Sequence, residues 1–160
     1  MAESRSPTLL DRAWRLALWM AYRILLAGWF VFRPRRRGVF IAVWHGDEVI
    51  VIRNSYRSWY ALPAGGIKRS ETPLQAAVRE LREEVGVEVS PEDLRFVADF
   101  PTTFEFKRDV CSFFELELAQ EPPLRLDGRE VVWADFVSVT EARALRMAPP
   151  VRAYLEARGS

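Results

Sequence analysis

Residues 65–87 read GGIKRSETPLQAAVRELREEVGV and are the most informative stretch of this sequence. Between Thr72 and Val85 the apolar side chains recur at steps of three and four residues, which predicts a helix with one buried face. The expected members of that face are Leu74, Ala77, Val78, Leu81 and Val85. Gly86 follows at the position of a C-cap glycine. The stretch therefore predicts a glycine loop, an amphipathic helix and a glycine stop.

Three carboxylates of the predicted helix share another face. Glu80, Glu83 and Glu84 have the spacing i, i+3 and i+4, so they fall within about 100° of arc. Clustered carboxylates repel one another, and they are tolerated either in full contact with water or around a hard cation such as Mg²⁺ or Mn²⁺. The residues alone leave a solvated acidic surface and a metal site as alternatives.

The spacing of the whole stretch resembles the Nudix box, G-x5-E-x7-R-E-U-x-E-E-x-G-U, in which U is aliphatic. Every defined position matches, namely Gly65, Glu71, Arg79, Glu80, Leu81, Glu83, Glu84, Gly86 and Val87. The resemblance implies an α/β/α sandwich with a mixed sheet. It also implies an enzyme that hydrolyses a pyrophosphate bond in a nucleoside diphosphate-linked substrate, with Mg²⁺ or Mn²⁺ as cofactor.

The resemblance further implies roles for the residues of the box, which we define as residues 65–87. The implied metal ligands are Glu80, Glu83 and Glu84. Arg79 is implied to orient the carboxylates, and Glu71 to brace the loop or to help hold the metals. Gly65 and Gly86 are the structural glycines at the two ends of the box.

Hydrolysis also needs a general base, and the family offers two positions for it. In some relatives the base is a glutamate of the box, which corresponds here to Glu84. In others it is a glutamate in the loop before the last strand, where this chain has Glu130, six residues before Phe136. We expect Glu130 to be an additional metal ligand or the base. The alternative is an ion pair between Glu130 and Arg129 or Arg125.

Composition limits the remaining possibilities. The 160 residues fit one domain, with or without an appendage. A single cysteine, Cys111, excludes an internal disulfide and any multi-cysteine metal site, and a single histidine, His45, leaves carboxylates to hold a metal. Residues 1–37 contain eight arginines and two acids (+6), whereas residues 38–160 contain 15 basic and 20 acidic residues (−5). We therefore expect an N-terminal helix and basic segment over 1–37 and a Nudix hydrolase domain over 38–160.

The N-terminal segment contains an apolar run. Residues 13–32 are long enough to cross a bilayer, but Arg15 and Arg23 interrupt them, and Pro34 ends the predicted helix. Three interpretations remain open: a helix packed on the domain or on a second subunit in a homodimer, a helix held to an anionic membrane surface by its arginines, and a transmembrane anchor. We expect a cytoplasmic location, with peripheral membrane attachment in the second case.

Runs of β-branched and aromatic residues predict further strands. Residues 38–44 and 49–53 flank the turn HGDE and predict a hairpin. The other expected strands are 94–100, 102–108, 110–119 and 131–139, and the other expected helices are 140–147 and 149–157. Glu105, Glu115 and Glu117 alternate with apolar residues on these strands, so we expect them to face outward.

The expected partner is a nucleotide-type small molecule, and no stable nucleic-acid partner is expected. The aromatic side chains available to stack a base are Tyr56, Trp59, Tyr60 and Phe104, and none of them identifies the substrate. The alternative function is a non-catalytic Nudix domain that binds or regulates, in one version at a membrane surface. Glu80, Glu83 and Glu84 argue against it, because degenerate binding homologues usually lose these residues.

Overall fold

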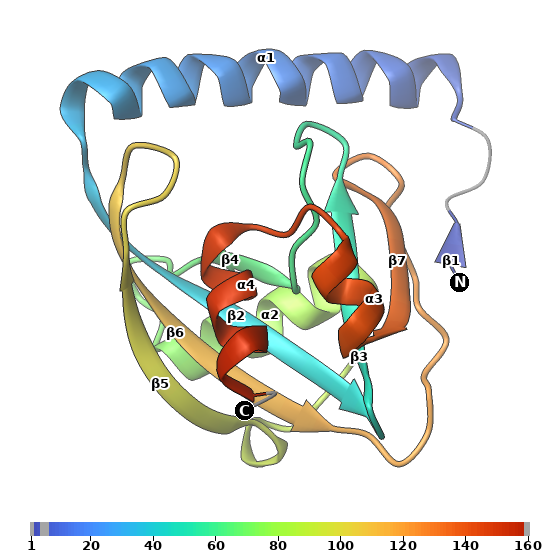
Figure 1. The fold of residues 1–160 in the computed structure, drawn as a ribbon. Helices are drawn as coiled ribbons and strands as arrows, with labels where there is room; N and C mark the ends of the chain where they lie inside the picture. Colours follow the sequence, from blue (N-terminus) through green and yellow to red (C-terminus); the bar gives the residue numbers. More distant parts are fainter. Residues whose placement is uncertain (1, 4–6, 159–160) are drawn as a thin grey trace.

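A single mixed β-sheet forms the centre of the molecule in the computed structural model, which describes residues 2–3 and 7–158. Residues 1, 4–6 and 159–160 of the two expected segments lie outside the described residues. The strands are β1 (Ala2–Glu3), β2 (Arg35–His45), β3 (Glu48–Asn54), β4 (Ala64–Gly66), β5 (Arg95–Thr102), β6 (Arg108–Glu117) and β7 (Val131–Ser138). They lie in the order β1-β7-β3-β2-β6-β5, with β4 paired to β2 beside this path (Figure 1).

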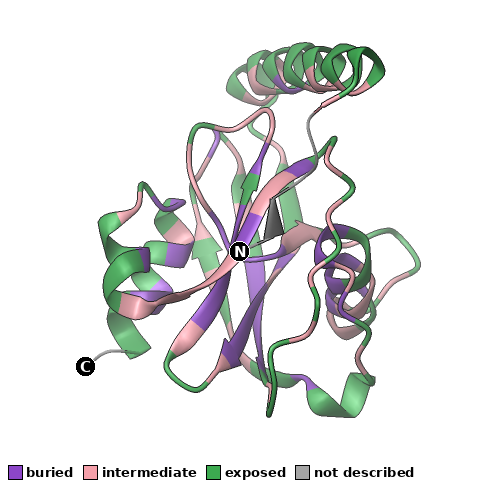
Figure 2. Cartoon of the chain, turned by 90° about the vertical axis from the view of Figure 1, so that its right-hand side faces the viewer, coloured by how far each residue is buried: buried purple, intermediate pink, exposed green. Residues whose placement is uncertain are grey.

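Helices cover both faces of the sheet. Helix α2 (Pro73–Val85) lies on one face, and α3 (Val139–Ala144) and α4 (Pro149–Arg158) lie on the other (Figures 1 and 2). A short 3-10 helix, η1 (Pro91–Asp93), precedes β5. The expected α/β/α sandwich with a mixed sheet is therefore confirmed.

Helix α2 forms as the pattern predicted. Thr72 caps its start by a capping box with Gln75, and Gly86 ends it with a left-handed φ of 71°. Ala77, Leu81 and Val85 are buried in the core shared with the sheet. The apolar face therefore fixes α2 against the sheet and determines which way its polar side chains point.

Strand β2 changes its partner along its length. Its last two residues pair with the start of β3 in the expected hairpin, whereas residues 38–40 pair with β4. On its other side, β2 runs parallel to β6. This exchange places residues 64–66, the glycine loop at which the box begins, directly on the central strand of the sheet.

Two expectations about β5 and β6 are wrong. Residues 103–107 form the turn between the two strands, with Glu105 and Phe106 at positive φ, instead of a strand over 102–108. Glu105 and Glu115 are buried instead of facing outward, whereas Glu117 is exposed as expected. Glu105 lies in the turn, where Lys107 of the same turn and Arg57 of a distant segment neutralise it. On β6, strand alternation fails for Glu115 because Arg95 of β5 and Arg158 of α4 neutralise it.

Helix α1 (Leu9–Phe32) lies across one end of the sandwich, over the loops that connect the strands (Figure 1). It starts four residues before the predicted 13–32, because Thr8 and Asp11 form a capping box. Arg15 donates two hydrogen bonds, of 3.0 and 2.7 Å, to the carbonyl oxygen of Gly128. Tyr22 is buried against the domain. One face of α1 is thus packed on the domain.

Candidate active site

Three side chains of α2 hold the glycine loop, each at a different residue. The Glu84 carboxylate accepts a hydrogen bond of 2.8 Å from the backbone N–H of Ala64. The Arg79 guanidinium donates one of 3.0 Å to the carbonyl oxygen of Gly66. The carboxylate of Glu80 lies against Gly65, where a Cβ atom would be only 1.8 Å from Glu80 Oε1. The absence of a side chain at Gly65 therefore lets Glu80 approach the loop backbone.

Arg79 connects the acidic residues of the box. Its Nε lies 2.7 Å from Glu71 Oε1, and its Nη1 lies 2.6 Å from Glu80 Oε1 and 3.1 Å from Glu83 Oε2. The hydrogen bonds from Arg79 lower the pKa of Glu71 to about 2, and the carboxylates in turn raise the pKa of Arg79. The guanidinium thus has the geometry to orient three carboxylates at once.

Burial raises the pKa of two other glutamates, the opposite of the change at Glu71. Glu80 and Glu84 are each only 8% exposed, and burial raises the pKa of Glu80 and raises that of Glu84 well above its usual range. Arg79 pairs with Glu80, whereas Glu84 accepts its hydrogen bond from a neutral backbone group and feels Arg57 only through its charge. These groups do not outweigh burial at either glutamate, so a bound cation would stabilise the charged forms of both carboxylates.

The donor set of the box fits a divalent cation. Glu80, Glu83 and Glu84 offer carboxylate oxygens, the ligands preferred by Mg²⁺ and Mn²⁺, and Glu83 remains exposed. Among the described residues, the set of three whose ligand atoms all lie within 4.8 Å of one another is instead His45, Glu48 and Glu121, at the β2–β3 hairpin and the segment after β6. The three box glutamates match a cation by their chemistry, and their ligand atoms are spaced more widely than this.

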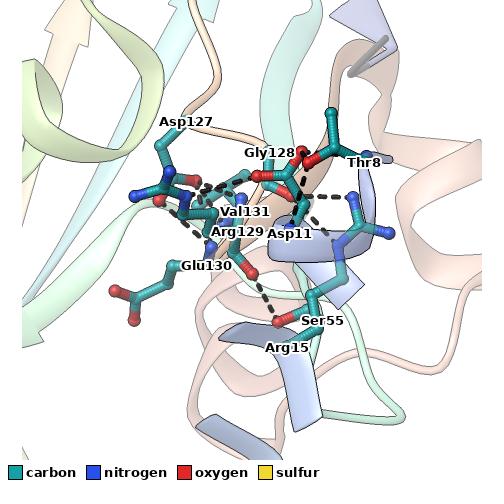
Figure 3. A network of polar contacts seen from close by, with 9 residues as sticks. All are labelled: Thr8, Asp11, Arg15, Ser55, Asp127, Gly128, Arg129, Glu130 and Val131. Carbon is teal, nitrogen blue, oxygen red and sulfur yellow. Dashed lines mark hydrogen bonds and ion pairs between the residues drawn. The ribbon is translucent and has the colours of Figure 1, made fainter. Parts of the chain in front are cut away.

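Glu130 belongs electrostatically to the box. Its carboxylate is exposed and accepts a hydrogen bond of 2.7 Å from the hydroxyl of Tyr56. In Figure 3 its side chain points away from the polar network that its backbone joins. The charge of Glu130 contributes to the raised pKa of both Glu80 and Glu84. Arg129, one of the alternative partners for Glu130, instead forms an ion pair of 3.3 Å with Asp11 of α1.

A cavity of about 270 Å³ borders the glycine loop. Its aromatic lining comes from Trp29, Phe40, Trp59 and Phe104, and its cationic lining from Arg36, Arg37, Arg57 and Lys107. The rings of Trp59 and Phe104 pack edge to face, 5.3 Å apart. Tyr60 packs against Trp133 instead, and Tyr56 binds Glu130. Glu105 and Asp109 also line the cavity and pair with Arg57 and Lys107, so the cavity combines flat apolar walls with four cations, two of which are partly neutralised.

Helix α1 contributes to this region, which its sequence pattern did not predict. Trp29 lines the cavity, with Lys107 Nζ 4.3 Å from its ring centre. The hydroxyl of Tyr22 donates a hydrogen bond of 2.9 Å to Glu105 Oε1, and the Arg57 guanidinium lies over the Tyr22 ring at 5.7 Å. One signal could have revealed this face, because Arg15, Tyr22 and Trp29 are spaced by seven residues and lie on one side of a helix.

Residues 34–157 match the sequence model of the NUDIX domain. This chain belongs to the Nudix family. An uncharacterised Nudix hydrolase of Pseudomonas aeruginosa is 33% identical over 138 residues, which are 76% of this chain and 78% of the relative. An RNA pyrophosphohydrolase of Nitratiruptor sp. is 26% identical over 121 residues, or 66% of this chain and 76% of that protein. The protein is accordingly a Nudix hydrolase, of a family of pyrophosphohydrolases.

A solved structure confirms the fold of this Nudix hydrolase. The bifunctional NMN adenylyltransferase/ADP ribose pyrophosphatase of Francisella tularensis, in complex with AMP and a manganese ion, superimposes with a TM-score of 0.64. The match covers 90% of this chain and 46% of that protein, at 19% sequence identity. At this level of sequence identity, the similarity shows a shared fold and nothing more.

Proposed function

We propose that this Nudix hydrolase cleaves the pyrophosphate bond of a nucleoside diphosphate-linked small molecule, with Mg²⁺ or Mn²⁺ as cofactor. The observation that carries the proposal is the position of Glu80 and Glu84, both buried: Glu84 is hydrogen-bonded to the glycine loop, Glu80 lies against it, and the loop also lines an aromatic, cationic cavity. The name of one relative, an RNA pyrophosphohydrolase, supports the bond class and a nucleotide component.

Glu80, Glu83 and Glu84 are the residues that we propose to hold the metal. A divalent cation bound there would neutralise phosphate charge and activate water. Arg79 keeps the carboxylates oriented through its contacts to Glu71, Glu80 and Glu83. Glu71 also accepts a hydrogen bond of 3.0 Å from the backbone N–H of Lys68, so it braces the loop from its other end.

We assign the general base to Glu130. In the reaction, a water oxygen attacks one phosphorus, the anhydride P–O bond breaks, and its electron pair leaves with the departing phosphate. The proton of the water passes to the Glu130 carboxylate, which solvent can reach and which Tyr56 holds in place. Glu84, the competing candidate, is buried and accepts the N–H of Ala64, an arrangement that suits a ligand better than a proton acceptor open to water.

The cavity supplies the nucleotide-type binding that this function requires. The rings of Trp29, Trp59 and Phe104 are flat apolar surfaces that suit a nucleobase. Arg36 and Arg37 line the same cavity, are exposed and suit a phosphate group, whereas Arg57 and Lys107 already pair with Glu105. The three aromatic residues, Arg36 and Arg37 are our proposed substrate contacts.

The test is a substrate panel with Mg²⁺ or Mn²⁺, containing ADP-ribose, a nucleoside triphosphate and a short RNA with a 5′ triphosphate. We expect the protein to hydrolyse at least one of these compounds, and we expect a metal chelator to abolish that hydrolysis. Glu84→Gln and Glu130→Gln should each lower kcat by more than about 100-fold. Glu92→Gln, an exposed glutamate outside the box, is the matched control and should retain full activity.

The variants also separate the two roles. Glu84→Gln should weaken metal binding measured by calorimetry without substrate. Glu130→Gln should leave metal binding nearly unchanged and should remove the rise in rate with pH that deprotonation of a general base produces. Turnover without metal, no turnover of any compound, or equal turnover by wild type and Glu84→Gln would each overturn the proposed function. Full activity of Glu130→Gln would assign the base to Glu84.

A further inference from the structure

The outer face of α1 is the largest exposed apolar surface among the described residues. Eleven large apolar side chains of α1 are exposed: Leu9, Leu10, Trp14, Leu16, Trp19, Met20, Ile24, Leu25, Phe30, Val31 and Phe32. The described remainder of the chain has three, namely Phe96, Phe106 and Val110. Soluble monomers rarely expose a continuous apolar surface of this kind without a partner. The outer face, defined by these eleven residues, therefore needs an explanation.

The shape of the outer face narrows the choice of partner. At 100° per residue, its side chains cover an arc of about 240° around the helix axis. A single partner helix buries a stripe of about 100°, so a second copy paired through α1 would leave much of the face in water. A continuous apolar medium covers a wider arc. Trp14 and Trp19 lie near opposite edges of the face, where amphipathic rings meet lipid headgroups.

The exposed charged residues of α1 and of the segment just after it are all arginines. Arg12 and Arg23 are exposed along one edge of the outer face, and Arg33 and Arg35 are exposed just beyond the end of the helix. The one acidic residue of α1, Asp11, faces the domain and pairs with Arg129 (Figure 3). Long arginine side chains can place their charge at the level of lipid phosphates while their stems remain in apolar surroundings.

We infer that α1 lies in the plane of an anionic lipid bilayer, with its outer face in the headgroup and acyl boundary, and docks the enzyme on the membrane. Among the described helices, α1 alone is long and apolar enough to cross a bilayer. A crossing orientation would break the bonds of Arg15 to Gly128 and of Tyr22 to Glu105. The in-plane orientation keeps both. This inference goes beyond the proposed reaction and is independent of it.

The test is flotation of the full chain with phosphatidylcholine vesicles, with and without about 30% phosphatidylglycerol. We expect the protein to float with the anionic vesicles, to float weakly with the neutral ones, and to be released by high salt in part. Arg12→Gln combined with Arg23→Gln should reduce the preference for anionic lipid.

Two exposed residues at the middle of the outer face test how much apolar contact contributes to membrane binding. Met20→Glu and Ile24→Glu each place a charge where lipid is inferred, and each should lower the partition coefficient by about tenfold or more. Val110→Glu makes the same change at an exposed apolar residue of β6 and should leave partitioning unchanged. Because all three positions are exposed, the melting temperatures should stay close to that of wild type.

Three outcomes would overturn the inference. The first is that the intact chain stays unbound with every vesicle. The second is a dimer, seen by light scattering without lipid, that Ile24→Glu dissociates, which would assign the outer face to a second copy. Resistance of the bound protein to extraction at alkaline pH would assign α1 to a transmembrane orientation. Pyrophosphohydrolase activity is not a readout of this test, so loss of the proposed function would leave it unaffected.

Discussion

At the residue scale, the contact between Gly65 and Glu80 explains why the box begins with glycine. The φ of Gly65 is not in the left-handed region, so backbone strain is not the reason. The reason is space, because a Cβ at this position would meet the Glu80 carboxylate. Gly66, the next residue, has open space around its Cα, with nothing within 4 Å of an added Cβ. The two neighbouring glycines therefore have different requirements.

This difference gives a matched pair of variants. Gly65→Ala should displace the end of the flexible Glu80 side chain, which costs little folding free energy but moves a proposed metal ligand. We expect kcat/KM to fall by about 100-fold, with a small change in melting temperature. Gly66→Ala should retain activity within a few-fold. Equal losses in both variants would contradict the spatial explanation.

At the element scale, α1 forms part of the active-site region through its inner face. Trp29 lines the cavity, while Tyr22 binds Glu105 in the β5–β6 turn. The Glu105 carboxylate also forms ion pairs with Lys107, at 3.2 Å, and with Arg57 Nε, at 3.4 Å. The Tyr22 hydroxyl is therefore one of three groups that stabilise the buried carboxylate. The helix and the turn hold each other, since each satisfies polar groups that the other would bury.

Removal of the Tyr22 hydroxyl tests this coupling. Tyr22→Phe should weaken the docking of α1 by about 1–3 kcal/mol, because Glu105 loses a buried donor. Hydrogen exchange should accelerate in residues 9–32, with little change in the core strands, and KM should rise because Trp29 is held less firmly. Tyr60→Phe, which alters a tyrosine packed on Trp133 within the domain, is the control. Unchanged exchange in α1 would contradict the coupling.

At the scale of the whole molecule, Glu115 joins the helical layer to the sheet. This carboxylate of β6 is 4% exposed, and Tyr154 and Arg158 of α4 both contact it. Burial alone would raise the pKa of Glu115, but the hydrogen bonds from Arg158 and Tyr154 outweigh burial and lower it below the ordinary value of 4.5. The folded state therefore stabilises the charged form.

The sign of the pH dependence follows. Because the pKa is lowered on folding, Glu115 contributes stability above the unfolded pKa, and this contribution is lost as the pH falls through the folded pKa. Glu115→Gln should cost about 2–4 kcal/mol of unfolding free energy at pH 7 and progressively less below pH 4.5. Urea titrations across this range would measure it. Glu117→Gln, exposed and paired to Arg158 at 2.9 Å, should cost about 0.5 kcal/mol or less.

Local sequence determined the box and its helix. The apolar spacing and the caps at Thr72 and Gly86 act within a few residues of chain, so α2 and its buried face could be predicted closely. The order of acidic residues along α2 likewise placed Glu80, Glu83 and Glu84 on one side of the helix. The fold class followed from the family resemblance, and the alternation of strands agreed with it.

Only the tertiary structure decided which charges are buried and what α1 touches. The sequence predicted Glu105 and Glu115 to face outward on strands, because the arginines that pair with them come from other segments. Lys107 is close in sequence, but it meets Glu105 through a turn that the strand pattern did not predict. The sequence predicted an N-terminal segment separate from the box, yet Trp29 of this segment lines the cavity beside the glycine loop. Contacts between residues far apart in sequence depend on how the layers pack, and a local pattern of apolar and polar residues does not contain that information.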